Sequence, residues 1–224
     1  MLFFRHRDVN DPVIGAFEES VLETLCHKHS QSVWVLPHLY DLPDGPGIAG
    51  ILPAIEQSLL GRQDACGPLY VFSWLSPRAA SAILRPKMQA VDFTCFDLEE
   101  IRNSTISLES LTLEAEKGES LGEIHRVELS VRRRWYPVID YQECRNCLEC
   151  VNFCLFGVYT IGENQTPLVE QPDQCRDGCP ACSRVCPAGA ILFPEYDDPI
   201  ISGRLKRTEA KDDLDRLIEQ VEYE

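Results

Sequence analysis

The placement of the cysteines constrains this chain more than any other feature. The sequence contains eleven cysteines, and eight of them fall between positions 144 and 186. An odd count disfavours a secreted disulfide framework. The first residues reach a charge at Arg5, too early for the apolar core of an export signal. We therefore expect a reducing, cytoplasmic compartment and a metal framework.

The eight clustered cysteines form an internal duplication. The two quartets read Cys144-x2-Cys147-x2-Cys150-x3-Cys154 and Cys175-x3-Cys179-x2-Cys182-x3-Cys186. A shift of 32 residues superposes the last three cysteines and the following glycine, Gly157, on their counterparts and on Gly189. Cys144 is one residue out of register with Cys175, because the second loop carries an extra residue. Each unit is too short to bury a face alone, so the two are expected to pack together.

This spacing suits iron–sulfur chemistry. Three thiolates two residues apart can wrap one iron–sulfur cube, while the fourth, after three further residues, points away and is expected to ligate the other cube. A zinc ribbon would use two Cys-x-x-Cys pairs for each ion and would leave the repeated fourth cysteine without a role. Zinc stays open as the alternative.

Residues 137–200 resemble the bacterial two-cluster ferredoxins in these motifs and in the closing turn Cys-Pro-Ala-Gly-Ala-Ile at 186–191. The resemblance implies two [4Fe–4S] clusters, the first held by Cys144, Cys147, Cys150 and Cys186 and the second by Cys154, Cys175, Cys179 and Cys182. It also implies short hairpin strands in Pro137–Tyr141 and Pro167–Glu170. Two departures are Leu155, where a proline is usual, and the extra residue after Cys175.

The N-terminal part has a different pattern. Apolar residues at helical spacing predict a helix from Pro12 to about residue 28, and Ser76-Pro77 is expected to cap a second helix that ends at Leu84. A further helix is expected at 53–60. Apolar runs at 32–36, 69–74 and 90–96 predict three strands. Alternating strands and helices indicate a small three-stranded, largely parallel α/β domain over residues 1–97, and the whole chain is therefore α+β.

The remaining segments complete the expected organisation. Residues 98–136 form an acidic connection with an edge strand, and alternation at Val127, Leu129 and Val131 predicts a strand there. Arg132–Arg134 is expected to be a solvated turn. Residues 137–200 form the ferredoxin domain, and residues 201–224 form an acidic helix.

The charge balance limits the partners. The chain has 36 acidic and 21 basic side chains and a net charge of −15, which argues against a nucleic-acid surface and for a protein partner with a basic docking face. No apolar run approaches the roughly 18 residues of a membrane helix, so no membrane span is expected.

Weaker candidates carry little chemistry. Gly45–Gly50 matches G-x-G-x-x-G, but it follows the preceding strand too distantly for nucleotide binding. His38 follows a strand and could face a pocket at the sheet edge. Cys26, Cys66 and Cys95 are expected to be buried small hydrophobes. One further set is expected to form the core of the small domain and to exclude water from the clusters: Trp135, Tyr141, Phe153, Phe156, Tyr159 and Phe193.

Three functions are compatible with these observations. The favoured one is an electron-transfer protein whose two clusters pass single electrons to or from a redox partner. A second is an oxidoreductase whose N-terminal domain binds a substrate and receives electrons from the clusters, although residues 1–130 show no catalytic constellation. A third is an assembly protein with structural clusters. No catalytic residue is assigned.

Overall fold

The computed structural model describes residues 1–29, 32–42, 69–88, 91–103 and 122–207. The glycine motif at 45–50, the helix expected at 53–60, Cys66 and most of the expected C-terminal helix lie outside these residues. Two compact units make up the chain, residues 1–133 and residues 134–224. The expected boundary at residue 200 stays a prediction.

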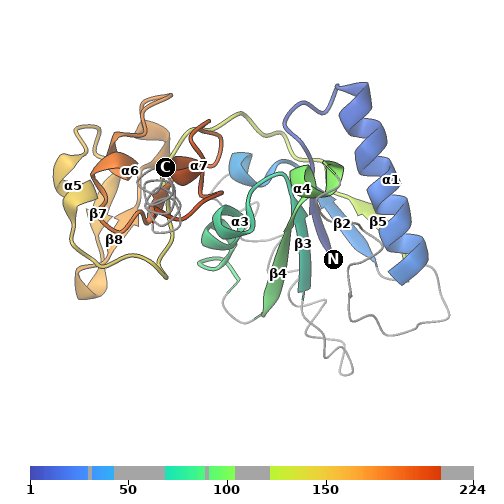
Figure 1. The fold of residues 1–224 in the computed structure, drawn as a ribbon, viewed down its shortest axis with the longest axis horizontal. Coiled ribbons are helices and arrows are strands. Elements are labelled where there is room, and N and C mark those ends of the chain that lie inside the picture. Colours follow the sequence, from blue (N-terminus) through green and yellow to red (C-terminus); the bar gives the residue numbers. More distant parts are fainter. Residues whose placement is uncertain (30–31, 43–68, 89–90, 104–121, 208–224) are drawn as a thin grey trace, which may run out of the picture. The chain divides into compact units, whose positions relative to one another are not determined.

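A five-stranded parallel sheet organises the N-terminal unit (Figure 1). Its spatial order is β4-β3-β1-β2-β5. The strands are β1 (Leu2–Phe4), β2 (Val33–Leu36), β3 (Leu69–Ser73), β4 (Phe93–Asp97) and β5 (Ile124–Arg126). The three expected strands are β2, β3 and β4, and the prediction of only three strands is wrong.

One strand of the sheet was missed and another lies a few residues from its expected position. β1 has three residues at the start of the chain, too few to show a period, and it lies in the centre of the sheet between β2 and β3. β5 is the edge strand Ile-His-Arg, which ends one residue before the alternation that begins at Val127. The strand expected at 127–131 is therefore displaced towards the N-terminus. A central position allows β1 to pair on both sides, which compensates for its shortness.

The helices of this unit begin where the sequence places capping residues. Asp11 accepts hydrogen bonds from the backbone N–H groups of Val13 and Ile14 at the start of α1 (Pro12–His29). Ser76 accepts one from Ala79 at the start of α3 (Pro77–Leu84). Asp97 caps the short α4 (Leu98–Arg102), and a 3-10 turn, η1 (Leu39–Asp41), follows β2. The expected helices at 12–28 and 77–84 are thus present.

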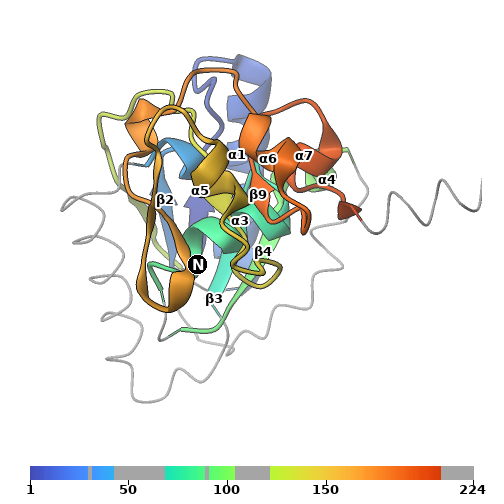
Figure 2. The same cartoon turned by 90° about the vertical axis from the view of Figure 1, so that its left-hand side faces the viewer.

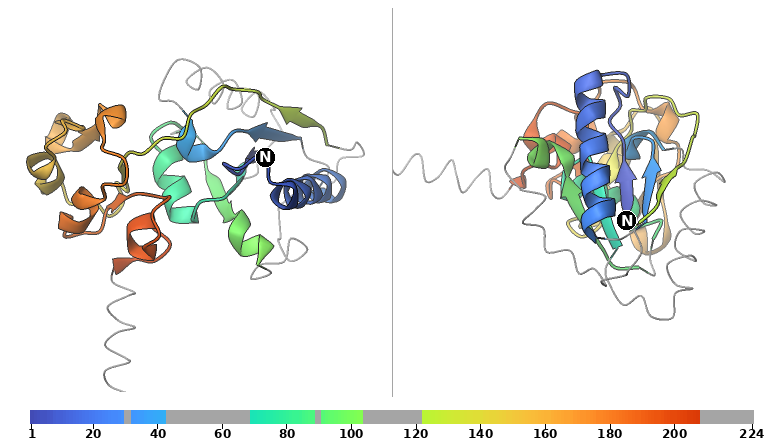
Figure 3. Two further views of the ribbon diagram at one scale, coloured as in Figure 1. Left: turned by 90° about the horizontal axis from the view of Figure 1, so that it is seen from above. Right: turned by 90° about the vertical axis from the view of Figure 1, so that its right-hand side faces the viewer.

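Two apolar layers cover the sheet. One face, with Phe3, Val35 and Phe72, packs against α1 and α4. In the right-hand view of Figure 3, α1 stands in front of the strands. Because side chains alternate along a strand, Leu2, Phe4 and Val71 point to the opposite face. All of these residues are at most 2% exposed, so the unit has the double-sided core typical of a parallel sheet.

The C-terminal unit repeats one small motif. Its elements are β6 (Val138–Ile139), α5 (Glu149–Phe153), β7 (Tyr159–Ile161), η3 (Glu163–Gln165), β8 (Pro167–Val169), η4 (Pro172–Gln174), α6 (Ala181–Val185), β9 (Ile191–Leu192) and α7 (Pro199–Ser202). Both α6 and β9 begin 32 residues after their counterparts α5 and β7. The antiparallel pairs are β6–β9 and β7–β8, so each pair joins the two copies of the motif. Figures 1 and 2 show α5 and α6 side by side.

The backbone carries the same repeat. Asn146 and Gly178, which the 32-residue shift superposes, both have positive φ, 54° and 72°. Gly157 and Gly189 likewise have φ of 68° and 60°. The left-handed conformation of Asn146 and Gly178 lets each loop reverse direction directly before a cysteine, whereas Gly157 and Gly189 lie three residues after one. The duplication in the sequence is therefore a duplication of structure.

In the described parts of the chain, no helix combines the length and the apolar character needed to cross a membrane.

Candidate metal centre

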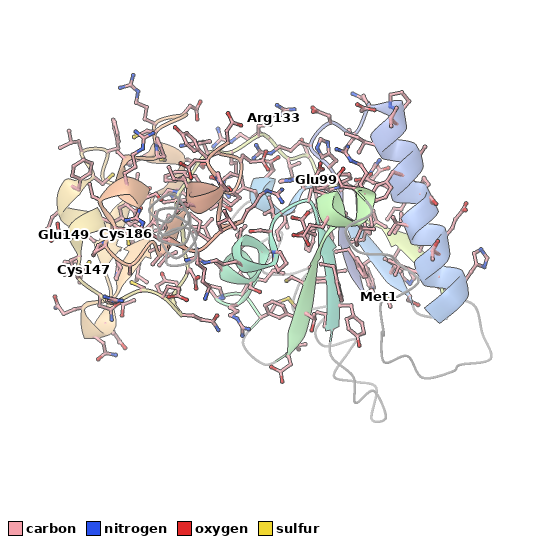
Figure 4. All side chains as sticks on the ribbon, viewed as in Figure 1. Met1, Glu99, Arg133, Cys147, Glu149 and Cys186 are labelled. Carbon is pink, nitrogen blue, oxygen red and sulfur yellow. The ribbon has the colours of Figure 1, made fainter. Side chains whose placement is uncertain are left out.

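Four cysteines from both copies of the motif line one cavity of the C-terminal unit. They are Cys144, Cys147 and Cys150 from the first copy and Cys186 from the second. Figure 4 labels two of them, Cys147 and Cys186. Apolar side chains, including Ile139 and Ile191, complete the wall. The cavity is narrow, about 10 Å³.

The other four cysteines line a second cavity of about 440 Å³. They are Cys175, Cys179 and Cys182 from the second copy and Cys154 from the first. The wall includes apolar and aromatic side chains, among them Phe153, Val158 and Tyr159. The last cysteine of each copy therefore shares a cavity with the first three cysteines of the other copy.

The local secondary structure explains this exchange. Cys150 lies in α5 and Cys182 lies in α6, whereas Cys154 and Cys186 follow the ends of these helices in extended conformation. The extended backbone turns the last thiol away from its own helix. The Sγ atom of Cys186 accepts a hydrogen bond from the backbone N–H of Ala190 at 3.3 Å, so one thiol already has an amide donor.

Burial sets the acidity of these thiols. It raises the pKa of Cys150 and of Cys175 to about 12, and the neighbouring thiols add to the shift. Burial also raises the pKa of Cys182 to about 11. Thiols of this kind are protonated at neutral pH, and the thiolate is the form that binds a metal. Loading these cavities with a metal centre would consequently release protons.

The described thiols are chemically available. All ten described cysteines are free. Within each cavity the exposure differs: Cys150, Cys182 and Cys186 are buried, whereas Cys147 is exposed. In the described ranges, no three or more His, Cys, Asp or Glu side chains have the close arrangement required around one metal ion.

The aromatic residues near the cysteines divide into two groups. Trp135 and Phe193 stack at 5.0 Å between ring centroids, and Tyr159 and Phe193 are buried. In contrast, Tyr141, Phe153 and Phe156 are 40–49% exposed. The expectation that all six form a core therefore holds for only part of the set. Leu155, at the position where proline is usual, is 91% exposed.

A separate cavity of about 710 Å³ lies at the carboxyl edge of the N-terminal sheet. As the sequence suggested, His38 lines it, and this side chain is only 4% exposed. Burial, followed by the positive charge of Arg7, lowers the pKa of His38 to about 3, so the imidazole is neutral at pH 7. Arg7 itself makes a two-point ion pair with buried Asp41, at 2.8 and 2.5 Å.

The basic lining of this cavity is largely neutralised by carboxylates. Arg5 pairs with Glu18, Arg126 pairs with Glu19 and Arg133 pairs with Asp8. Arg132–Arg134 was expected to be a solvated turn. Arg134, however, is only 8% exposed: its guanidinium lies over the ring of Tyr136 and pairs with Asp173. The prediction of a solvated turn is therefore wrong for Arg134.

Sequence reasoning missed the buried carboxylate of Glu18. It is 1% exposed and accepts hydrogen bonds from the Arg5 side chain, the backbone N–H of His6 and the indole N–H of Trp74. A signal was present, because Glu18 lies four residues after Ile14 and four before Leu22 on the apolar face of α1. Of the other scattered cysteines, Cys26 is buried as expected, while Cys95 is half-buried and accepts a hydrogen bond from Ser81.

Comparison with known proteins identifies part of the chain. No family model matches it. The chain is 46% identical over 66 residues to an uncharacterized ferredoxin of Methanocaldococcus jannaschii, which is 29% of this chain and 44% of that protein. It is 39% identical over 59 residues to a ferredoxin of Methanothermococcus thermolithotrophicus, which is 25% of this chain and 95% of that protein. The chain thus spans less than half of the first relative and nearly all of the second. Through this stretch, the chain belongs to the ferredoxin family.

Proposed function

We propose that this chain is an electron-transfer protein that carries two [4Fe–4S] clusters in its C-terminal unit. The observation that carries the proposal is the sorting of eight cysteines into two cavities, four thiols in each. Membership of the ferredoxin family supports an iron–sulfur carrier.

The sharing of cavities supports one assignment of the ligands. Cys144, Cys147, Cys150 and Cys186 hold the first cluster, and Cys154, Cys175, Cys179 and Cys182 hold the second. A cube takes one thiolate at each of its four irons, and in two-cluster ferredoxins the last cysteine of each motif serves the other cluster. The crossed lining of the two cavities supports the same exchange here.

The two cavities differ in how well they fit a [4Fe–4S] cluster. The four-thiol donor set is suitable at both cavities, and the volume is suitable at the second. At the first cavity, the exposed side chain of Cys147 and its neighbours must move outwards. When bound, each cluster accepts and releases one electron. The surrounding protein supplies thiolates, an amide donor at Cys186 and apolar walls that keep water away, all of which influence the reduction potential.

The partner is a redox protein with a basic docking face. A chain with a net charge of −15 attracts such a surface over long range and repels nucleic acid. The association rate should fall as ionic strength rises. A cytoplasmic compartment suits ten described thiols that are all free.

A redox titration monitored by EPR tests this function. The full chain is purified without oxygen and reduced stepwise, and the expected result is reversible one-electron reduction with the signals of two interacting S = 1/2 centres. Clusters that resist reduction at every accessible potential would contradict electron transfer and favour the structural role. A protein without any iron–sulfur absorption would overturn both.

A second candidate is an oxidoreductase whose N-terminal unit binds a substrate. The observation that favours it is the cavity at the carboxyl edge of the parallel sheet, where such folds commonly bind ligands. His38, Arg7 and Asp41 are its innermost polar groups. Trp74, which follows β3, and Phe96 in β4 are not among the described lining residues of this cavity. Binding of inorganic phosphate that His38→Asn abolishes would favour this function, and absence of binding would count against it.

A further inference from the structure

The buried hydroxyl of Tyr159 makes no hydrogen bond of ordinary geometry within the described part of the chain. The residue is the first of β7, and only 7% of it is exposed. Leaving a buried polar group unsatisfied is costly, and native proteins rarely do so without a reason.

The surroundings of this hydroxyl indicate which acceptor it meets. Tyr159 lines the second cavity together with Cys154, Cys175, Cys179 and Cys182. Of these four cysteines, Cys182 is the one whose side chain interacts with the Tyr159 hydroxyl. A phenol hydroxyl is a hydrogen-bond donor at neutral pH.

The duplication shows that this donor is present on one side only. The shift of 32 residues superposes Tyr159 on Ile191, the first residue of β9. Ile191 lines the first cavity as Tyr159 lines the second, and it is 2% exposed. The two cavities thus have the same framework at this point, but the second has an O–H group where the first has a hydrocarbon side chain.

We propose that the Tyr159 hydroxyl donates a hydrogen bond to the Cys182 sulfur once that sulfur ligates the second cluster, and makes this cluster the easier of the two to reduce. The inference rests on the proposed function. A donor aimed at a ligand sulfur stabilises the more negative, reduced state and so raises the reduction potential. Tyr159 would act on the second cluster through the Cys182 sulfur. In the singly reduced protein, the electron would then reside preferentially on the second cluster.

Removing one oxygen atom tests the proposal. In the full chain, Tyr159→Phe keeps the ring and its packing, and both potentials are measured by anaerobic EPR titration after iron and sulfide have been counted. The more positive of the two potentials should shift to a more negative value, and a shift of only the other potential would refute the proposal. A hydrogen bond to a charged acceptor of ordinary net strength would change the reduction equilibrium about tenfold, or about 59 mV for one electron.

Tyr141 offers a matched control. Its hydroxyl already donates, at 3.1 Å, to the backbone carbonyl of Pro167, a residue that lines the other cavity. Tyr141→Phe removes the same atom from a hydroxyl that has an acceptor. We expect it to leave the potential of the second cluster unchanged.

A second probe tests the direction of the effect without removing the group. Replacing Tyr159 with 3-fluorotyrosine makes the hydroxyl a stronger donor and should shift the same potential to a more positive value. Resonance Raman spectra should show that the iron–sulfur stretching bands respond to D2O differently in the wild type and in Tyr159→Phe. These readouts are independent of any partner.

The outcomes separate this inference from the function on which it rests. With both clusters present and both potentials unchanged in Tyr159→Phe, the hydrogen bond is refuted while the electron carrier stands. Equal shifts at both clusters would also refute it, since they would indicate a general change in packing. A chain that contains no clusters would overturn both proposals.

Discussion

The two units of this chain are stabilised in different ways. The N-terminal unit has a five-stranded sheet with two apolar layers, in which Phe3, Phe4 and Phe72 are fully buried. The C-terminal unit has helices of four or five residues, strands of two or three, and a core in which Cys150, Cys182 and Cys186 occupy buried positions. Small domains of this kind usually need a metal or another cross-link. One unit can thus rely on hydrophobic burial, whereas in the other the proposed clusters would supply much of the stability.

Removal of the metal centre should have the largest effect. An iron chelator applied under acidic, anaerobic conditions should abolish amide protection in the C-terminal unit, because the free energy of binding is a large part of its free energy of folding. The sheet of the N-terminal unit should keep its protection. Hydrogen–deuterium exchange with mass spectrometry measures both units in one sample. Unchanged protection in residues 134–207 after full loss of iron would mean that the C-terminal unit, like the N-terminal unit, is stable without a metal centre.

Pairs of cysteine substitutions test the crossed ligation. Cys154→Ala with Cys182→Ala removes two ligands of one cluster, so about half of the iron and sulfide should remain. Cys154→Ala with Cys150→Ala removes a ligand from each cluster and should leave almost none. If each motif held its own cluster, the two results would be exchanged. Cys26→Ala is the control, since Cys26 is buried in the N-terminal core and should not affect the iron content.

A substitution that creates a cavity in the N-terminal core should destabilise the N-terminal unit without changing the iron content. Phe72 is fully buried against α1 and α4, so Phe72→Ala should lower the free energy of unfolding of this unit by about 3–5 kcal/mol. Urea unfolding followed by tryptophan fluorescence measures the loss. Iron and sulfide per chain should stay at the wild-type values. A parallel fall in iron content would show that the units fold as one.

The smallest expected effect is a pH dependence of the free energy of unfolding of the N-terminal unit. Because burial and then Arg7 lower the pKa of His38 to about 3, the unfolded chain binds a proton there more readily, with an ordinary pKa of about 6.5. The contribution of His38 to the free energy of unfolding is fully present above about pH 6.5. It declines as the pH falls towards 3, by at most about 1.4 kcal/mol per pH unit.

His38→Asn should remove this part of the pH dependence. Urea midpoints at pH 7.5 and pH 5 for the wild type and the variant isolate it from the pH dependence that the two proteins share. His6 and Arg133, which also disfavour a charge on His38, are unchanged in the variant. Equal pH slopes for the two proteins would contradict the assignment.

The two units also differ in how much of each could be predicted. In the C-terminal unit, residue spacing predicted more, because a cysteine quartet fixes a local loop and the 32-residue shift predicted two similar loop-and-turn units, although the short helices α5 and α6 were not predicted. In the N-terminal unit, β1 was missed because three residues show no period, and only its neighbours make it a central strand. Glu18 and Asp41 acquire their burial from partners distant in sequence. The free hydroxyl of Tyr159 is likewise a property of packing.

The metal and sulfide content of the intact chain tests the central claim most directly. The protein is purified without oxygen, its mass is measured under non-denaturing conditions, and iron, acid-labile sulfide and zinc are quantified in the same sample. The proposal predicts about eight iron and about eight sulfide per chain, with little zinc. Two zinc ions without sulfide would contradict it and would make the C-terminal unit a zinc-stabilised interaction module.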